Sequence, residues 1–410
     1  MKIGFFTDTY FPQVSGVATS IKTLKKELEK MGHEVFIFTT TDPNAPEDEA
    51  GIIRMPSVPF VSFKDRRIVV RGMREAYLLA KELDLDLIHT HTEFGTGLLG
   101  KFVGKRLEIP VIHTYHTMYE DYLHYIANGK VFRPAHVRFL SRIFANHTTG
   151  VVCPSERVSQ TLADYGVITP MRIIPTGIDI KRFESTEQTA SQIQELRKSL
   201  GLAKDDIFLL SLSRISYEKN IQALIQHFPE VLEEKSNARL VIVGKGPYEE
   251  ELKKMITELE IADKVIFVGE VPNNEVARFY QAADYFVSTS TSESQGLTYL
   301  EALASGTQVV VEGNVYLDQL VDDESLGTTF IKDEDFAPAL LAYIDKKIKV
   351  DPQILSRKRA EISAETFGLA MIDFYNDMLI YYQKIIAEKK VLEHHQVKAK
   401  HKRSFRKTTH

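Results

Sequence analysis

The segment ARLVIVGKGPYEEELKKMITELEIADKVIFVG (238–269) contains the pattern that decides the fold. Two apolar runs of strand length, ARLVIVG (238–244) and KVIFVG (264–269), lie on either side of a helical pattern near 247–260. Short apolar strands that alternate with helices are typical of a parallel sheet covered by helices on both faces. The segment therefore predicts a strand, a helix and a second, parallel strand in succession.

The same alternation continues toward both ends of the chain. Further runs of strand length are KIGFF (2–6), EVFIFTT (34–40), DLIHTH (86–91), PVIHTY (110–115), DIFLLSLS (206–213), YFVSTS (285–290) and TQVVVE (307–312). Helical patterns occur near 68–83, 95–106, 218–235, 273–283 and 297–305. We expect an α/β protein of two doubly wound, Rossmann-like units that face each other across a cleft and are joined near 175–185. Such sheets bind ligands at the carboxyl ends of their strands, so functional residues are expected in the loops that follow strands.

The composition of the 410-residue chain is that of a globular protein, with 43% hydrophobic and 26% charged residues. Cys153 is its single cysteine, which excludes a disulfide scaffold and a cysteine-built zinc site. The first residues do not have the form of a signal peptide, and no run of about 18 apolar residues indicates a membrane span. These features predict a cytoplasmic protein.

The net charge of −5 is unevenly distributed along the chain. Residues 1–180 hold 21 Lys and Arg against 20 Asp and Glu, residues 181–388 hold 22 against 35, and residues 389–410 hold eight against one. The contrast favours two units with different tasks, followed by a tail that attracts anions.

Three segments that follow predicted strands have residues suited to a phosphate-bearing ligand. Gly16, in PQVSGVATS, would let backbone N–H groups at a helix start approach an anion, although an ordinary tight turn explains it equally well. Arg214 and Lys219, in SRISYEKN, suit a diphosphate, with two solvated cations as the alternative. The glycines of VGKGP (243–247) lack the rest of the dinucleotide fingerprint, so hydride chemistry is not expected.

The most informative segment is TSTSESQGLTYLEALASGT (289–307), which follows a predicted strand. Glu293 lies in its Ser- and Gly-rich loop, and Glu301 lies on the helix that begins around Leu297. Such a loop presents backbone N–H groups at a helix N-terminus, where a phosphate or a hydroxyl-rich ligand is favoured. The two carboxylates would each bind the hydroxyls of a different sugar. Glu301 has apolar neighbours on its helix, so a merely solvated helix face explains it poorly.

Six motifs occur in an order that resembles the family 4 retaining glycosyltransferases, which have the GT-B fold. They are PQVSGVATS, PTGIDIKRF, RISYEKN, VGKGP, VGEV and the Glu-x7-Glu spacing of SESQGLTYLEAL, and the resemblance extends to about residue 388. Within the family, HTYHTMYEDYLHYIANGKVFRP (113–134) looks like the corresponding segment of bacterial diacylglycerol α-glucosyltransferases. The division of the chain that this implies is an acceptor unit (1–178), a nucleotide-sugar unit (179–365), a helix that crosses back onto the first unit (366–388) and a basic, disordered tail (389–410).

The resemblance also implies a role for each matched residue. Arg214 and Lys219 would hold the donor diphosphate, Glu301 would bind the nucleotide ribose, and Glu293 would contact the sugar hydroxyls. His116 would reach the reacting sugar from the acceptor side and complete the catalytic set. The other donor-binding positions, which would act through backbone groups or close packing, are Gly16, Gly244, Val271, Gln295, Gly296 and Leu297.

No metal site is expected. His89, His91, His113 and His116 cluster at the ends of two predicted strands, but no Asp, Glu or Cys set at ligand spacing accompanies them. His116 suits a hydrogen-bond donor or a proton relay better than a ligand of zinc. The resemblance implies that cations and a helix dipole offset the diphosphate charge, so that no cofactor is required; a stimulatory Mg²⁺ stays open.

Two basic segments of the first unit are candidates for contact with an anionic membrane. In KVFRPAHVRFLSRIFANH (130–147), one helical stripe is apolar and arginines lie on the opposite side; the stripe consists of Val137, Leu140 and Phe144, with Phe139 and Ile143 adjoining. Basic amphipathic helices bind anionic interfaces, but an ordinary core-facing helix has the same pattern. KDRRIVVRGMR (64–74) adds five cations in eleven residues. The predicted membrane or acceptor residues are Arg133, Arg138, Phe139, Arg142 and Phe144.

The resemblance implies a peripheral enzyme of the cytoplasmic membrane face that moves glucose from UDP-glucose to 1,2-diacylglycerol in an anionic membrane, with retention. Its product would be α-monoglucosyldiacylglycerol, a membrane glycolipid of the class that precedes lipoteichoic acid anchors, and no nucleic acid partner is expected. Two alternatives stay open: addition of a second hexose to glucosyl-diacylglycerol, and a non-catalytic subunit that binds a sugar nucleotide. A galactose donor and the oligomeric state also stay open.

Overall fold

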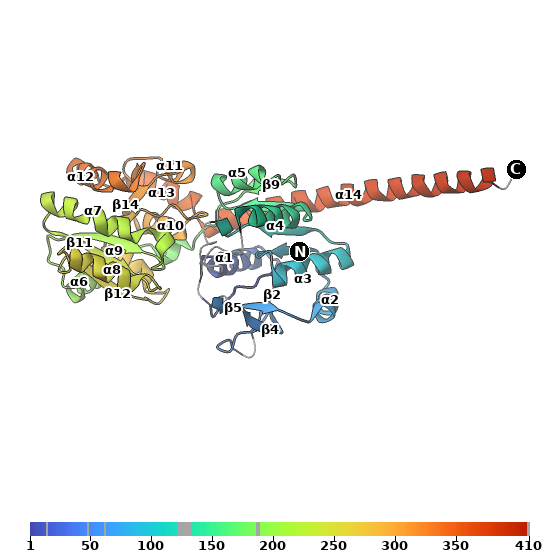
Figure 1. Ribbon diagram of the computed structural model, residues 1–410, viewed down its shortest axis with the longest axis horizontal. Coiled ribbons are helices and arrows are strands. Elements are labelled where there is room, and N and C mark those ends of the chain that lie inside the picture. Colours follow the sequence, from blue (N-terminus) through green and yellow to red (C-terminus); the bar gives the residue numbers. More distant parts are fainter. Residues whose placement is uncertain (14, 47–48, 61–62, 121–132, 186–188, 408–410) are drawn as a thin grey trace.

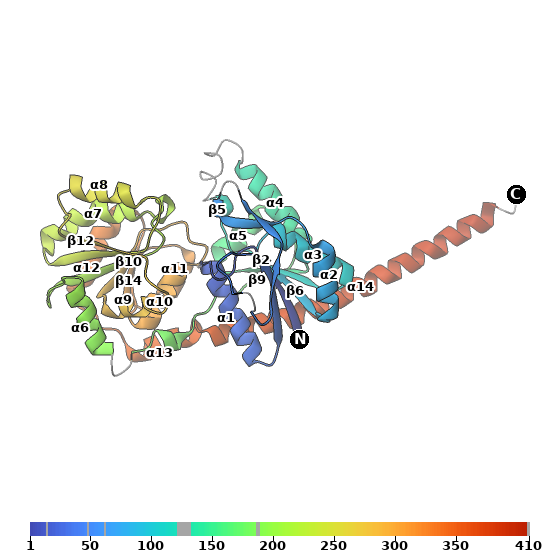
Figure 2. The same ribbon diagram turned by 90° about the horizontal axis from the view of Figure 1, so that it is seen from below.

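The computed structural model describes all residues except 14, 47–48, 61–62, 121–132, 186–188 and 408–410. Two parallel sheets with flanking helices form two α/β units that lie side by side (Figure 1). A long C-terminal helix runs from between the units along the first of them and projects beyond it (Figure 2). The expectation of two doubly wound units in series is confirmed.

The first sheet has seven parallel strands in the order β3-β2-β1-β6-β7-β8-β9. All residues of β6, β7 and β8 are buried, as expected for strands covered on both faces. The strands are β1 (Lys2–Phe6), β2 (Glu34–Thr40), β3 (Ile52–Met55), β6 (Leu87–Thr90), β7 (Val111–Thr114), β8 (Gly150–Cys153) and β9 (Met171–Ile173). The helices are α1 (Gly16–Lys30), α2 (Met73–Glu82), α3 (Gly95–Leu107), α4 (Pro134–Asn146) and α5 (Glu156–Asp164).

The helix expected near 68–83 begins later than the sequence predicts. An antiparallel pair, β4 (Ser57–Phe60) and β5 (Phe63–Val69), occupies the start of that segment. Gly72 follows with a φ of 105°, a left-handed conformation that a continuing helix does not allow, and α2 starts at Met73. The basic segment 64–74 is therefore divided between a strand and a helix start.

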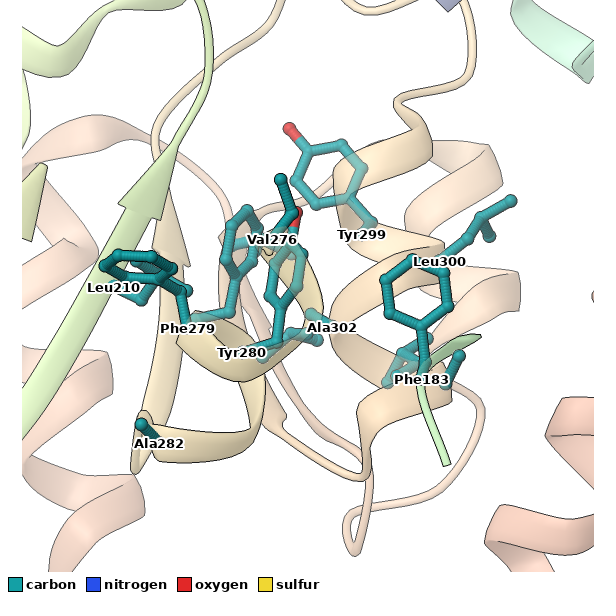
Figure 3. Packing of buried hydrophobic residues seen from close by; sticks show 14 of the residues in the cluster. Phe183, Leu210, Val276, Phe279, Tyr280, Ala282, Tyr299, Leu300 and Ala302 are labelled. Carbon is teal, nitrogen blue, oxygen red and sulfur yellow. The ribbon is translucent and has the colours of Figure 1, made fainter. Parts of the chain in front are cut away.

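The second sheet has six parallel strands in the order β12-β11-β10-β13-β14-β15. They are β10 (Ile207–Leu212), β11 (Ala238–Val243), β12 (Val265–Gly269), β13 (Tyr285–Ser288), β14 (Gln308–Glu312) and β15 (Gly327–Phe330). The helices of this unit are α6 (Thr189–Ser199), α7 (Ile221–Glu234), α8 (Glu249–Glu258), α9 (Val276–Ala282), α10 (Leu297–Ser305), α11 (Val315–Leu320), α12 (Phe336–Lys346) and α13 (Pro352–Glu361). Phe279 and Tyr280 of α9 pack with Tyr299 and Leu300 of α10, which fixes α10 against the sheet (Figure 3).

The strand order reverses once in each sheet. In the first sheet the chain moves outward from β1 to β3 and returns to β6, on the other side of β1. In the second sheet it moves from β10 to β12 and returns to β13, on the other side of β10. Doubly wound sheets bind ligands outside the carboxyl ends of the strands at this reversal. The loops after β1, β10 and β13 are therefore the expected site.

The C-terminal helix α14 (Ala364–Lys407) joins the two units. It starts beside the segment that links them, because the Ala364 N–H donates to the Ile178 carbonyl at 2.8 Å and the Ile178 N–H donates to the Ile362 carbonyl at 3.0 Å. Phe367, Met371 and Phe374 then enter the core of the first unit. The expectation that the helix crosses back onto this unit is confirmed.

The prediction of a disordered tail at 389–410 is not met in the backbone. The helix continues to Lys407, and residues 389–407 contain neither the Pro nor the Gly that would end it. The tail has eight cations and few apolar residues and cannot bury a core of its own, but a helix that has already begun can propagate without one. Within the described ranges, no helix is both long and apolar enough to cross a membrane.

Candidate active site

The N-termini of α1 and α10 approach each other between the two units. Gly16 is the first residue of α1, and the Ser15 hydroxyl caps the helix by accepting from the Ala18 N–H at 3.1 Å. A Cβ placed on Gly16 would lie 3.9 Å from Cδ1 of Leu297, the first residue of α10. The first turn of a helix has N–H groups without an intrahelical acceptor and carries a partial positive charge. Two such starts close together are suited to an anion such as a diphosphate.

Two of the predicted catalytic residues form an ion pair. Lys219 comes from the loop after β10 and Glu293 from the loop after β13, and Nζ of Lys219 lies 2.5 Å from Oε1 of Glu293. Both side chains are mostly buried, with 13% and 19% exposed. Arg214, in the same loop as Lys219, is exposed and has no ion pair or hydrogen-bond partner for its guanidinium in the described part of the chain. The site thus contains one neutralised cation and one available cation.

The second carboxylate of the Glu-x7-Glu motif lies beside a tyrosine. The Tyr280 hydroxyl of α9 donates to Oε2 of Glu301 at 2.9 Å. Burial raises the pKa of the Glu301 carboxyl to about 7, against the lowering effects of the Tyr280 hydrogen bond and the charge of Arg182. Glu301 is therefore poised to change its protonation state near neutral pH. Sequence reasoning missed Tyr280, which reads as one more apolar position of a short helix.

Two glycines hold the Arg214 loop through close packing. Gly244 has a φ of 139°, and a Cβ there would lie 1.9 Å from the Ser213 carbonyl oxygen. A Cβ on Gly246 would lie 2.0 Å from the Ile215 carbonyl oxygen. Since these contacts are with backbone, no larger residue fits without moving the loop. Gly244 thus packs directly against the residue before Arg214, and Val271 is half-buried against the neighbouring core.

The residues before α10 serve both units. Gly296, at the N-cap of α10, has a φ of 84°, and a Cβ there would meet the Tyr299 ring at 2.4 Å. The Gln295 side chain is buried, accepts from the Thr176 N–H at 2.8 Å and donates to the Thr176 carbonyl at 2.8 Å. Because the side-chain amide of Gln295 binds the segment that links the units, only the backbone of Gln295 is available for the predicted donor-binding role.

The four predicted histidines have different partners. His89 contacts the Tyr375 hydroxyl of α14 at 2.6 Å and the Thr114 hydroxyl at 2.7 Å, while His113 lies 3.2 Å from the Glu93 carboxylate. Nδ1 of His91 lies 3.0 Å from Nε2 of His116. Burial lowers the pKa of His116 to about 3, so this imidazole is neutral at physiological pH. A neutral ring suits hydrogen bonding to a sugar hydroxyl, and no cluster of three or more potential metal ligands occurs among the described residues.

Only part of the apolar stripe expected on the predicted membrane helix α4 is exposed. Phe139, Leu140 and Ile143 are 52%, 45% and 40% exposed, and the predicted Arg133, Arg138 and Arg142 are also exposed. Val137 and Phe144 are buried. The Phe144 ring lies 4.8 Å from the His113 ring, with Nζ of Lys101 4.2 Å away on its face.

The prediction that Phe144 contacts a membrane is therefore wrong. The helix packs on the first unit through positions 137, 141 and 144, whereas Leu140 faces outward with Phe139. The stripe was assigned from spacing alone, which does not say which of two overlapping apolar faces meets the core. Phe94 and Leu98 near the start of α3 are also exposed apolar residues, at 49% and 58%, and the sequence analysis did not select them.

Comparisons with known proteins show the family of the chain. Residues 14–182 match glycosyltransferase family 4, and residues 192–365 match glycosyl transferases group 1. A Streptococcus pneumoniae protein named alpha-monoglucosyldiacylglycerol synthase is 52% identical over 391 residues, which cover 95% of this chain and 89% of that protein. The chain belongs to glycosyltransferase family 4. An Acholeplasma laidlawii protein of the same name is 35% identical over 378 residues, covering 90% of this chain and 94% of its own.

Solved structures support the fold of this family 4 glycosyltransferase. Anabaena HepE, solved in complex with UDP, has a TM-score of 0.71 and 20% identity, and the match covers 92% of this chain and 100% of HepE. WaaG, a glycosyltransferase involved in lipopolysaccharide biosynthesis, has a TM-score of 0.62 and 16% identity, and the match covers 93% of this chain and 98% of WaaG. The expected GT-B architecture is confirmed.

Proposed function

We propose that this family 4 glycosyltransferase moves glucose from UDP-glucose to 1,2-diacylglycerol and makes α-monoglucosyldiacylglycerol. The observation that carries the proposal is the 52% identity over 95% of the chain to the Streptococcus pneumoniae alpha-monoglucosyldiacylglycerol synthase. The close approach of two helix N-termini and the Lys219–Glu293 pair support it, because a nucleotide sugar offers an anionic diphosphate and several hydroxyls to such groups.

Each of these groups has a role in the proposed reaction. The bond between the glucose anomeric carbon and the diphosphate breaks as positive charge forms on the sugar, and negative charge grows on the leaving phosphate oxygens. Arg214, Lys219 and the helix starts at Gly16 and Leu297 stabilise that charge without a required metal. The diacylglycerol hydroxyl attacks from the face that the leaving group vacates, and its proton passes to the leaving phosphate, so the α configuration is retained.

Glu301 would accept hydrogen bonds from the ribose hydroxyls, and Glu293 would bind the sugar hydroxyls. The neutral His116 would donate a hydrogen bond to the glucose from the side of the first unit. The acceptor would enter from an anionic membrane against α4, where Phe139, Leu140 and Ile143 lie exposed beside Arg138 and Arg142. In this proposal the enzyme works peripherally on the cytoplasmic face of the membrane.

The test is a product analysis with defined vesicles. Phosphatidylglycerol vesicles containing diacylglycerol or glucosyl-diacylglycerol are incubated with UDP-glucose or UDP-galactose, in EDTA and in Mg²⁺, and the lipids are separated. We expect monoglucosyldiacylglycerol from UDP-glucose and diacylglycerol alone, sensitive to an α-glucosidase and formed in EDTA. A diglycosyl product, or a β-linked one, would contradict the proposal. Absence of both lipid product and UDP release would favour an accessory sugar-nucleotide-binding subunit.

A further inference from the structure

The first unit makes a set of hydrogen bonds to the loop that carries Glu293. Nη1 of Arg157 donates to the Thr291 carbonyl at 2.7 Å and to the Glu293 carbonyl at 3.0 Å. The Ser155 hydroxyl donates to the Ser294 carbonyl at 2.5 Å. Arg157 and Ser155 belong to the start of α5, which follows β8 in the first sheet. Three carbonyls of one loop, those of Thr291, Glu293 and Ser294, are thus held by the opposite unit.

These bonds fix the direction of the loop's N–H groups. In a trans peptide the C=O and the following N–H point in opposite directions. Because the carbonyls of Thr291, Glu293 and Ser294 point toward α5, the N–H groups of Ser292, Ser294 and Gln295 point away from it. None of these three N–H groups has an acceptor among the residues that the structure describes. They remain available as donors on the side of the loop that faces away from α5.

The same loop is also tied to the predicted acceptor-side histidine. The Ser294 hydroxyl donates to the His116 carbonyl at 2.9 Å, while the Ser294 carbonyl accepts from Ser155. Ser294 therefore joins α5, His116 and the loop of Glu293 in one network. On the other side of the loop, the Glu293 side chain is held by Lys219. The loop is fixed by the first unit through its backbone and by the second unit through its carboxylate.

We propose that Arg157 is a positioning residue of the first unit that orients loop 291–295 for the donor sugar. It acts through the loop and has no contact with the substrate in this role. An Arg guanidinium is suited to the task because one planar, permanently charged group serves two carbonyls at once. The proposal rests on the proposed function in that loop 291–295 is taken to bind the donor. It couples the acceptor-binding unit to the geometry of the donor site.

Arg157→Ala and Arg157→Lys are the variants that test the role, with Arg278→Ala as a matched control. Arg278 is an exposed arginine paired with Glu275 one turn away on the surface. Arg157 is only partly buried, and its removal leaves the hydrophobic clusters of both units untouched, so folding is expected to persist. Thermal unfolding of each variant verifies this before further measurement.

The first readout is hydrogen–deuterium exchange of the ligand-free protein, followed on a peptide that spans 289–297. We expect Arg157→Ala to accelerate exchange in this peptide at least about tenfold, because Ser290, Ser292 and Gln295 are buried and the released loop would open to solvent more often. The second readout is glucosyl transfer. We expect kcat to fall about 10- to 100-fold with a smaller change in the KM for UDP-glucose, because the sugar is misplaced rather than unbound. Arg157→Lys should recover part of both effects, and Arg278→Ala should change neither.

Unchanged exchange at 289–297 in Arg157→Ala would overturn the inference, and so would an unchanged kcat. A kcat loss that Arg157→Lys does not relieve in any part would also overturn it, since a lysine can still reach one carbonyl. The exchange measurement needs no substrate. If the wild-type protein transferred no glucose, the proposed function would fail while the exchange comparison still decided whether Arg157 holds the loop.

Discussion

Lys219 and Glu293 neutralise each other across two loops that follow neighbouring strands of one sheet. The 2.5 Å contact joins the residue expected to hold a diphosphate to the residue expected to hold a sugar. A donor that binds both partners must insert its charge beside the ammonium and its hydroxyls beside the carboxylate. The pair therefore links recognition of the leaving group to recognition of the group that is transferred.

This pairing predicts opposite effects of Glu293→Gln on binding and on transfer. Without the carboxylate, Lys219 offers an uncompensated charge to UDP, so UDP affinity should rise about fivefold, or ~1 kcal/mol. Glucosyl transfer should fall at least about 100-fold, because the sugar loses a charge-assisted hydrogen bond. Calorimetric titration with UDP and steady-state kinetics measure the two effects. Lys219→Met is the matched control and should weaken UDP binding; weaker UDP binding by Glu293→Gln would argue against the pairing.

Donor affinity should depend on pH through Glu301. The carboxyl, with its pKa raised to about 7 by burial, accepts ribose hydroxyls well only when ionised, so affinity should rise as pH increases through that value. Between pH 6 and pH 8 the ionised fraction of such an acid grows about tenfold, and the affinity for UDP-glucose should follow. Tyr280→Phe removes a hydrogen bond that lowers this pKa, so its midpoint should move to higher pH.

The appropriate ligand for this measurement is UDP-glucose, because its diphosphate has no terminal phosphate that titrates near pH 6. Glu301→Gln serves as the control and should show a flat, low affinity across the same range. A wild-type profile that is flat from pH 6 to pH 8, or a Tyr280→Phe midpoint at lower pH, would show that Glu301 does not control donor binding.

Substitutions of Arg214 and Gly244 should both reduce activity, but only the substitution of Gly244 should also reduce stability. The Arg214 side chain is exposed and makes no hydrogen bond or ion pair in the described structure. Arg214→Ala should therefore lower kcat/KM by a factor equivalent to ~2–4 kcal/mol of activation free energy and leave Tm unchanged. Gly244→Ala should also reduce activity, but with a loss of about 1–3 kcal/mol of stability or more, since its φ and the Ser213 carbonyl oppose a Cβ. Equal melting temperatures for both variants would contradict this separation.

The sequence predicted the fold and the strand-end loops because both follow from local periodicity. Parallel strands buried on both faces read as apolar runs, and their loops must meet at one edge. It did not predict the Tyr280–Glu301 contact or the bonds from Ser155 and Arg157, since these join segments separated by 21 to 139 positions. A capped helix start after a strand, as in CPSERV, was a signal that the sequence analysis passed over.

The exposed and the buried face of α4 should respond differently to substitution. Replacing Phe139, Leu140 and Ile143 by Ser should leave stability nearly unchanged and weaken binding to phosphatidylglycerol vesicles, because these side chains are already exposed. Phe144→Ala should instead cost about 3–5 kcal/mol of unfolding free energy, because the ring is buried. Chemical denaturation and vesicle sedimentation distinguish the two. Unaltered vesicle binding by the triple variant would remove α4 from the membrane contact.

The projecting end of α14 should contribute electrostatic attraction to the same membrane. Residues 389–410 hold eight Lys and Arg against one acid, whereas residues 1–388 hold 43 against 55. Near an anionic surface each cation is worth about 1 kcal/mol, and salt screens the attraction. Deleting 389–410 should therefore weaken sedimentation with phosphatidylglycerol vesicles, and added salt should weaken the full-length protein in the same way. Hydrolysis of UDP-glucose without lipid should not change, because every donor motif precedes residue 389.

Neutral phosphatidylcholine vesicles serve as the control and should bind the full-length and shortened proteins equally. If the shortened protein bound phosphatidylglycerol as tightly as the full chain at low salt, α4 alone would carry the contact and the helical tail would have no part in anchoring.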